Sequence, residues 1–366
     1  MGLLGKTNRS GFVLLAATTC LLGLNYVAVR AEKIPNSAAV APEFEFVSPA
    51  QDSAITPENQ PWRQVRLVHS LKQDKTVVDS LVFSPDSKTL VSGGGSNNPQ
   101  MNLWSVEQGS SLAKIRAQRT AILAMAISPD GKSLISGGKD SALNVWDWQT
   151  GKYQAALLEH SKSVTSLAIS PDSQVLVSGG LDGIKVWDLT TSPQRPLYTL
   201  VGKDHLINVV AIHPNGYIVA SGDDRGKVAF WNLRTGSKIS DFSPHTDLIS
   251  GLAFSPDGDT LITASHDRQI KIWNLGSGEL QQTLTGHSDA VRAIALNPQG
   301  GILASGGNDG ILIWDLASGK LLHQLNDHRN WVQSLAFSPD GNYLASGGYD
   351  FTVKVWSDSL LMSNEQ

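Results

Sequence analysis

Tryptophan recurs along this chain at an almost constant interval, and this recurrence constrains the possible folds more than any other feature. Seven of the ten tryptophans lie 41 to 44 residues apart, namely Trp104, Trp146, Trp187, Trp231, Trp273, Trp314 and Trp356. A second marker runs in phase with the first, at Pro85, Pro129, Pro171, Pro214, Pro256, Pro298 and Pro339. Two markers in phase over seven copies indicate that one supersecondary unit is repeated seven times.

The copy from Leu284 to Leu316 shows what one unit contains. Its short apolar segments are separated by Gly, Pro, Asn and Asp, as β-strands joined by turns require. We expect strands at 291–296, 302–305 and 311–314, and a more polar fourth strand at 279–284. The first turn reads Ser-Pro-Asp-Gly in three copies, where Pro favours the second position of a type I turn and Gly tolerates a positive φ.

The Gly-His, Ser-Gly and Trp-Asp pairs that recur at this period resemble those of the WD-repeat (WD40) family. Trp-Asp stands at 146–147, 187–188 and 314–315, and it becomes Trp-Asn at 231 and 273 and Trp-Ser at 104 and 356. The resemblance covers the chain from 65 to 358, and we expect an exported, bacterial-type member of the family. It implies an all-β fold, a seven-bladed β-propeller of four-stranded antiparallel blades.

The two ends of the repeated region predict how the ring closes. Ten residues follow Trp356, which is too few for another well-formed outer strand, whereas 65–68 is a spare strand before the first complete unit. We expect this spare strand to pair as the outermost strand of the last blade. Such pairing would protect strand edges that are otherwise exposed.

A Ser, a His and an Asp recur together, which suggests a hydrolase, but the resemblance implies an internal hydrogen-bond chain in each blade. Buried polar groups need partners, and His, Ser or Thr, Asp and Trp can satisfy one another. Four blades carry the full tetrad: His160, Ser178, Asp182 and Trp187; His245, Thr263, Asp267 and Trp273; His287, Ser305, Asp309 and Trp314; His328, Ser346, Asp350 and Trp356. We therefore predict no catalytic, metal-binding or cofactor-binding residues.

Three blades depart from the tetrad. Blade two has Gln118 at the His position, blade four has Lys203 and Arg225 at the His and Asp positions, and blade one has Asp74 at the His position. One interpretation is that neighbouring blades hold these three in place. The other is that blades one and four carry altered loops for a ligand.

The resemblance also implies where a partner binds, on the face that carries the Gly-His loops and the Asp turns. Contact positions lie three and five residues beyond the His and one before the Asp. The predicted partner-binding residues are Trp331, Gln333, Tyr349, Arg292, Asn308, Leu248 and His266. Trp, Tyr and Arg most often dominate interface energy. The alternative is that Trp331 merely covers the rim of the central channel.

The amino terminus has the layout of an export signal. Lys6 and Arg9 precede an apolar run at 11–29, and Val29 and Ala31 suit cleavage after Ala31. The run is also long enough to remain as a single membrane anchor. We expect a signal or anchor at 1–31, a Pro-rich disordered linker at 32–61, the propeller at 62–358 and a tail at 359–366.

Composition limits the function further. The formal net charge of −4 argues against a nucleic-acid binder, which would show a basic excess. No carboxylate pair, metal cluster or nucleophile with a base stands out from the repeat. We predict a monomeric, noncatalytic protein-interaction scaffold, extracytoplasmic or membrane-tethered, with an unknown protein partner. The alternative is an extracytoplasmic enzyme or a small-ligand sensor that uses the central channel.

Overall fold

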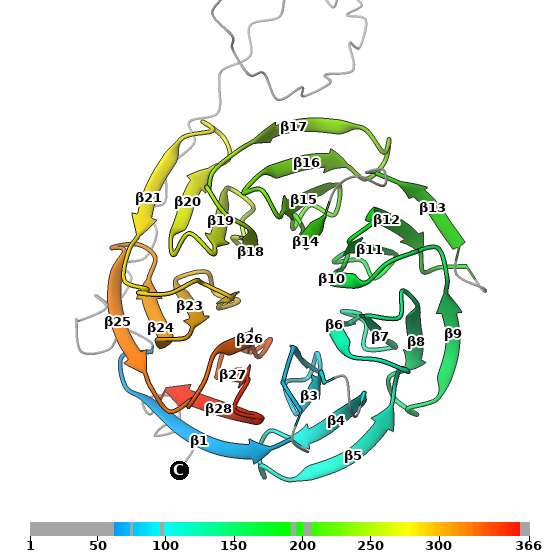
Figure 1. Cartoon of the computed structure of the whole chain (residues 1–366), viewed down its shortest axis with the longest axis horizontal. Coiled ribbons are helices and arrows are strands. Elements are labelled where there is room, and N and C mark those ends of the chain that lie inside the picture. The colour runs from blue at the N-terminus through cyan, green and yellow to red at the C-terminus, as the bar shows by residue number, and fades with distance from the viewer. Residues whose placement is uncertain (1–61, 74–75, 96–98, 192–194, 201–205, 359–366) are drawn as a thin grey trace, which may run out of the picture. The chain divides into compact units, whose positions relative to one another are not determined.

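A computed structural model describes residues 62–358 of the chain, except 74–75, 96–98, 192–194 and 201–205. The described residues form seven four-stranded antiparallel sheets and no helix. Figure 1 shows the seven sheets arranged as blades around a central axis, with the first strand of each blade innermost. The predicted fold, an all-β propeller of seven four-stranded blades, is therefore confirmed.

The strands of the first four blades run in chain order from the axis outwards. Blade one contains β2 (Ser80–Phe83), β3 (Thr89–Gly93), β4 (Gln100–Ser105) and β5 (Ser111–Arg116). Blade two contains β6 (Ile122–Ile127), β7 (Ser133–Gly138), β8 (Leu143–Asp147) and β9 (Tyr153–Leu157). Blade three contains β10 (Val164–Ile169), β11 (Val175–Gly180), β12 (Gly183–Asp188) and β13 (Arg195–Thr199). Blade four contains β14 (Ile207–Ile212), β15 (Ile218–Asp223), β16 (Val228–Asn232) and β17 (Lys238–Phe242).

Blades five and six repeat this order, and blade seven does not. Blade five contains β18 (Ile249–Phe254), β19 (Thr260–Ser265), β20 (Ile270–Asn274) and β21 (Leu280–Leu284). Blade six contains β22 (Ala293–Leu296), β23 (Ile302–Gly307), β24 (Gly310–Asp315) and β25 (Lys320–Leu325). Blade seven contains β26 (Val332–Phe337), β27 (Tyr343–Gly348) and β28 (Thr352–Asp358), and its outermost strand is β1 (Val65–Lys72) from the start of the propeller.

Ring closure by β1 follows the prediction, but the contact is longer than the sequence suggested. β1 pairs antiparallel with β28 from Val65 opposite Asp358 to Lys72 opposite Thr352. Upstream of β1, the Trp62 side chain is 1% exposed, and its ring lies edge-on to Phe337 at 5.0 Å between centroids. Blue β1 and red β28 lie side by side in Figure 1. Closure therefore combines strand pairing with one buried indole.

Two hydrogen bonds hold the residues before β1 against the last two blades. The Trp62 backbone N–H donates to the Asp358 carboxylate, and the His323 ring of blade six donates to the Arg63 carbonyl. The first described residues therefore bind blade six as well as blade seven. Trp62 lies 42 residues before Trp104, in phase with the Trp markers, but the spacing alone does not show which blades its neighbours contact.

Close packing between blades seven and one explains why glycine stands near the end of β27. A Cβ added to Gly347 of blade seven would lie 2.2 Å from Cγ1 of Val78, which precedes the first strand of blade one. No side chain fits at that separation, because interiors are packed at van der Waals contact. Val78 is fully buried by this approach. Glycine is therefore required where the last blade meets the first.

A Pro-containing turn, which reads Ser-Pro-Asp in five of the seven blades, joins the first and second strands of each blade. These turns define one face of the ring, called here the turn face. In blade two, Gly131 N–H donates to the Ser128 carbonyl at 2.8 Å and adopts a φ of +68°. Blade three has Ser173 at this position with a φ of +62°, and its hydroxyl accepts the Asp130 N–H of blade two at 3.0 Å. A hydrogen bond between blades thus accompanies the less favourable serine conformation.

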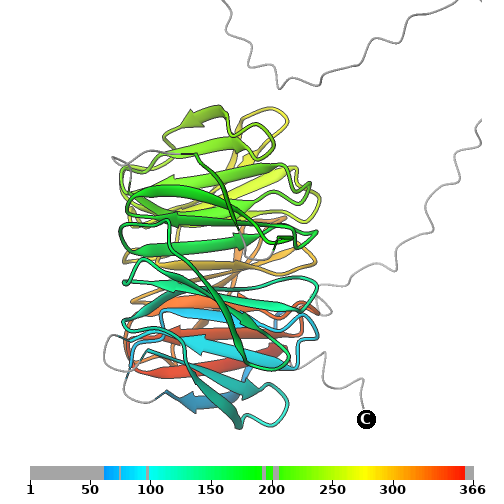
Figure 2. The ribbon, with the colours of Figure 1, turned by 90° about the vertical axis from the view of Figure 1, so that its right-hand side faces the viewer.

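The opposite face is called here the loop face, because it carries the loops before the first strands and the turns between the second and third strands. In Figure 2 the ring is seen from the side, with strands running between these faces. Trp62 lies at the turn face, beside the ends of β26 and β28. Within the described residues no helix could span a membrane, and the predicted 11–29 segment falls outside them.

Candidate functional site

The first strands of all seven blades enclose a cavity of about 450 Å³ along the central axis. Its lining includes the seven residues that lie five positions beyond the His position of each unit. These are Asp79, Leu123, Thr165, Asn208, Ser250, Arg292 and Gln333. The sequence register therefore converges on one ring of side chains at the loop face, called here the mouth ring.

The channel becomes apolar two residues further along the first strands. In six blades this position lines the same cavity, with Leu81, Met125, Leu167, Leu252, Ile294 and Leu335. The serine hydroxyls that also line the cavity, on Ser80, Ser166 and Ser334, already bond to backbone groups of neighbouring blades. An ionised group moved past the mouth ring would therefore lose its hydration and gain little in return. Polar recognition is therefore confined to the mouth.

An aromatic and cationic cluster stands at the mouth on blades six and seven. The Trp331 and Tyr349 rings meet edge to face, with centroids 5.4 Å apart and planes at 80°. The Arg292 guanidinium carbon lies 4.0 Å from the centroid of the Trp331 ring. Arg292 Nη1 also donates to Gln333 Oε1 at 3.4 Å. Four of the predicted partner-binding residues thus form one contact group.

The other three predicted partner-binding residues are placed differently. Leu248 and His266 line the channel on blade five. Burial, and then the charge of Arg292, lower the pKa of His266, so its imidazole is neutral at pH 7. Asn308 is exposed on blade six and is outside the channel lining. Six of the seven predicted partner-binding residues therefore lie around the channel mouth.

Hydrogen bonds between neighbouring blades hold the channel wall in place. The Thr165 hydroxyl donates to the Ile207 carbonyl at 2.6 Å, and the Ser250 hydroxyl donates to the Val291 carbonyl at 2.6 Å. The Ser334 hydroxyl donates to the Val78 carbonyl at 3.0 Å. These bonds satisfy polar groups on the first strands and fix blade positions, so the mouth is preformed.

The four predicted tetrads lie inside their blades as continuous hydrogen-bond chains. In blade three, His160 Nδ1 donates to Asp182 Oδ1 at 2.6 Å, and Nε2 accepts from the Ser178 hydroxyl at 2.7 Å. The Trp187 indole N–H donates to the same hydroxyl oxygen at 2.9 Å. The direction of each bond follows from its partners, because the carboxylate and the indole fix both ends of the chain.

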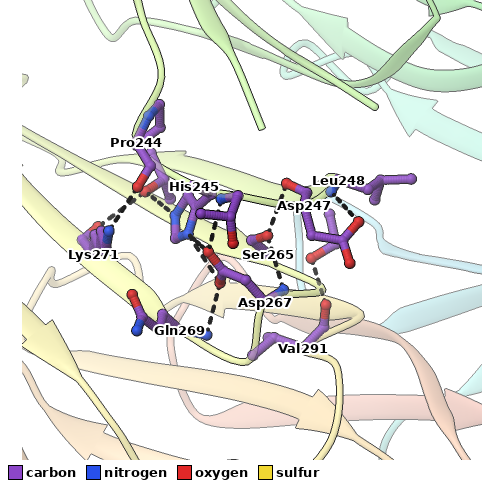
Figure 3. A network of polar contacts seen from close by, with 12 residues as sticks. Pro244, His245, Asp247, Leu248, Ser265, Asp267, Gln269, Lys271 and Val291 are labelled. Atoms are coloured by element: carbon purple, nitrogen blue, oxygen red, sulfur yellow. Dashed lines mark hydrogen bonds and ion pairs between the residues drawn. The ribbon is translucent and has the colours of Figure 1, made fainter. Parts of the chain in front are cut away.

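The same chain links the equivalent residues of blades five, six and seven. The imidazole-to-hydroxyl distances are 2.8 Å for His245 and Thr263, 2.7 Å for His287 and Ser305, and 2.7 Å for His328 and Ser346. In Figure 3 the Asp267 carboxylate lies beside His245, while Lys271 reaches the Pro244 carbonyl. Ser178, Thr263, Ser305 and Ser346 are each 0% exposed. A substrate therefore cannot reach these four hydroxyls.

Burial and hydrogen bonding set the charge states of blade three. Burial lowers the pKa of His160 and outweighs the opposite effect of Asp182. Burial also opposes ionisation of Asp182, but the Ser161 N–H and His160 hold the pKa of that carboxyl below its usual range. The pair is therefore a neutral imidazole donating to a carboxylate.

Blade one corrects one sequence assignment. Asp74 is at the predicted His position and lies outside the described residues, but the neighbouring Gln73 takes the His role. The Ser92 hydroxyl donates to Gln73 Oε1 at 2.6 Å, and the Trp104 indole N–H donates to Ser92 at 2.8 Å. Counting back from the turn proline missed this by one residue, because loop length shifts the register.

Blades two and four retain the Trp-to-Ser bond. Trp146 N–H donates to the Ser136 hydroxyl at 3.3 Å, and Trp231 N–H donates to the Ser221 hydroxyl at 2.9 Å. In blade two Gln118 Oε1 and Asp140 Oδ1 are buried without a partner among the described residues. Lys203 of blade four lies outside those residues, and the Asp223 carboxylate accepts the turn N–H groups of Arg225 and Lys227.

Comparison with known proteins assigns the family. The model of the WD domain, G-beta repeat, matches residues 65–105, 109–147, 151–188, 194–232, 236–274, 278–315 and 319–357. These matches span more than half of the chain, so the chain belongs to the WD-repeat family. A search of curated proteins gives no match. Each match begins with the outer strand of one blade and continues into the next, which explains why β1 completes blade seven.

Proposed function

We propose that this protein is a noncatalytic protein-interaction scaffold that binds its partner at the loop face. The aromatic and cationic cluster of Arg292, Trp331 and Tyr349 carries this proposal, because these residue types dominate binding energy at interfaces. Family membership supports it, since propellers of this family commonly mediate protein–protein interactions. Trp62 lies at the turn face, so the chain enters the propeller at the end opposite the cluster.

Affinity capture with the full chain tests this proposal. We expect Trp331→Ala combined with Tyr349→Ala to abolish capture of proteins that the unaltered chain retains, because truncation removes the centre of the contact. Arg234 and Tyr217 provide a matched control on the turn face, where the guanidinium carbon lies 3.7 Å from the ring centroid. Tyr217→Ala should leave capture unchanged. Identical captured proteins for the double variant and the unaltered chain would refute the proposal.

We further propose that the protein is exported or held at a membrane through residues 1–31. The support is the sequence alone: two basic residues, an apolar run at 11–29 and small or aliphatic residues before Glu32. Amino-terminal mass spectrometry of the protein from its own cells tests this. Glu32 as the first residue supports cleavage, and an intact terminus in the membrane fraction supports an anchor. An intact terminus in the cytosolic fraction contradicts both.

The channel cavity favours one alternative, a sensor or enzyme that binds a small ligand there. A cavity of about 450 Å³ is within the size range of small-molecule sites. The two functions respond differently to Leu252→Trp, which would fill the apolar part of the channel behind the mouth. A small-ligand function would be lost, whereas capture of a protein at the rim would persist.

A further inference from the structure

The mouth ring contains one cation and one anion. Arg292 supplies the guanidinium and Asp79 the carboxylate, and the other five positions are uncharged. Burial raises the pKa of Asp79. This effect outweighs the hydrogen bond from the Gly95 N–H and the charge of Lys139, which both lower the pKa. The formal charges of the ring therefore sum to zero, and Arg292 is the group with which an incoming anion would pair.

Arg292 is held in place without a carboxylate partner. Trp331 covers one face of the guanidinium, and Gln333 accepts one hydrogen bond from it. Among the described residues no carboxylate lies within ion-pair distance of Arg292. A guanidinium has five N–H donors in a planar fork, and only one of those of Arg292 has a hydrogen-bond partner among the described residues. Fixing the fork in advance lowers the entropic cost of binding an anion.

We propose that the partner presents a single carboxylate, from an Asp or Glu side chain, to Arg292 at the channel mouth. A neighbouring apolar side chain of the same peptide segment packs against Trp331 and Tyr349. This inference rests on the proposed function and names the chemistry of its partner. One guanidinium fork matches one carboxylate in a bidentate pair.

Charge balance distinguishes a carboxylate from a phosphate at this site. A phosphorylated side chain carries close to two negative charges at neutral pH. It would face one guanidinium while the ring also holds Asp79, and the neutral His266 adds no positive charge. The apolar residues beyond the ring cannot stabilise the second charge. A monoanion therefore fits the mouth better than a dianion.

Peptide pools provide the test without knowledge of the partner. The full chain is immobilised and challenged with random nonapeptides whose central residue is fixed as Glu, Gln, Lys or phosphoserine. We expect the Glu pool to be retained about tenfold more than the Gln pool, since hydrogen bonds to an ionised acceptor are stronger than those to a neutral one. The Lys and phosphoserine pools should be retained less than the Glu pool.

Variants assign any preference to the proposed residue. Arg292→Gln should remove the Glu preference, and Arg292→Lys should reduce it because the planar fork is lost. Arg234→Gln removes an equally stacked arginine from the turn face and should change nothing. Equal retention of the Glu and Gln pools, a phosphoserine preference, or an unchanged preference in Arg292→Gln would overturn the inference. The proposed function would still stand if the Trp331 and Tyr349 double variant lost its captured proteins.

Discussion

Blades two and three are neighbours in the ring and differ at one position of the tetrad. Blade three has His160, which bonds to Asp182 and Ser178 at 2.6 and 2.7 Å. Blade two has Gln118, which donates to the Ala142 carbonyl at 3.3 Å and leaves its own oxygen without a partner among the described residues. Both blades nevertheless form all four strands. The tetrad therefore strengthens a blade but is not required to form one.

The largest expected difference between the two blades comes from removing the serine hydroxyl. Ser178→Ala should lower the free energy of unfolding by about 2–4 kcal/mol, because it leaves two buried groups, the His160 imidazole and the Trp187 indole, without a partner. Ser136→Ala should cost about 1 kcal/mol, because a single bond of 3.3 Å is lost. Urea denaturation of both variants measures the difference. Equal losses would show that the imidazole adds nothing.

Exchanging the residues at the His position, Gln118 and His160, should change the stability by an intermediate amount. The sign of the change should differ between the two blades. Gln118→His is expected to stabilise the protein by about 1 kcal/mol, because an imidazole can bond to Asp140 and Ser136 and satisfy a buried carboxylate oxygen. His160→Gln should destabilise it by about 2 kcal/mol. Thermal melting of the two single variants and the double exchange provides the comparison. A destabilising Gln118→His would mean that blade two has repacked around the glutamine.

The smallest expected effect is a dependence on pH that blade three contributes and blade two does not. Burial lowers the pKa of folded His160 below the value of about 6.5 that an unfolded chain has. The stabilisation is complete above that value and is lost as pH falls below it, because the unfolded chain then binds the proton more strongly. Melting temperatures from pH 8 to pH 5 should fall less steeply for His160→Gln than for the unaltered chain. Gln118→Asn is the control, and its slope should match that of the unaltered chain.

Several features of the site could be predicted because the repeat samples each position seven times. Counting five residues beyond the His position identified channel-lining residues in every blade, even where the His itself is absent. The position one before the Asp was less reliable. It placed Tyr349 against Trp331 but left Asn308 outside the channel lining. Strand positions repeat closely, whereas turn positions also depend on the local loop.

Other features required contacts between residues that are distant in the chain. In blade one, Gln73 takes the role that the sequence count assigned to Asp74, because the loop turns the Gln73 side chain towards Ser92. Similarly, Trp62 falls in phase with the repeat, 42 residues before Trp104, but its role follows from contact with Phe337, which is 275 positions away in the chain. Such contacts depend on how the ring closes, and local pattern does not encode them.

The number of blades and the strand order could be predicted from the repeat, and the family resemblance added the residues that form the tetrads. The prediction was possible because strand periodicity, turn chemistry and the Trp and Pro markers are local properties that recur in phase. Three features became visible only in the folded ring: Arg292 stacks on Trp331, residues of seven separate blades form one mouth ring, and Trp62 is buried where the ring closes. These features arise where different blades meet, because packing and desolvation depend on all the neighbours of a side chain at once.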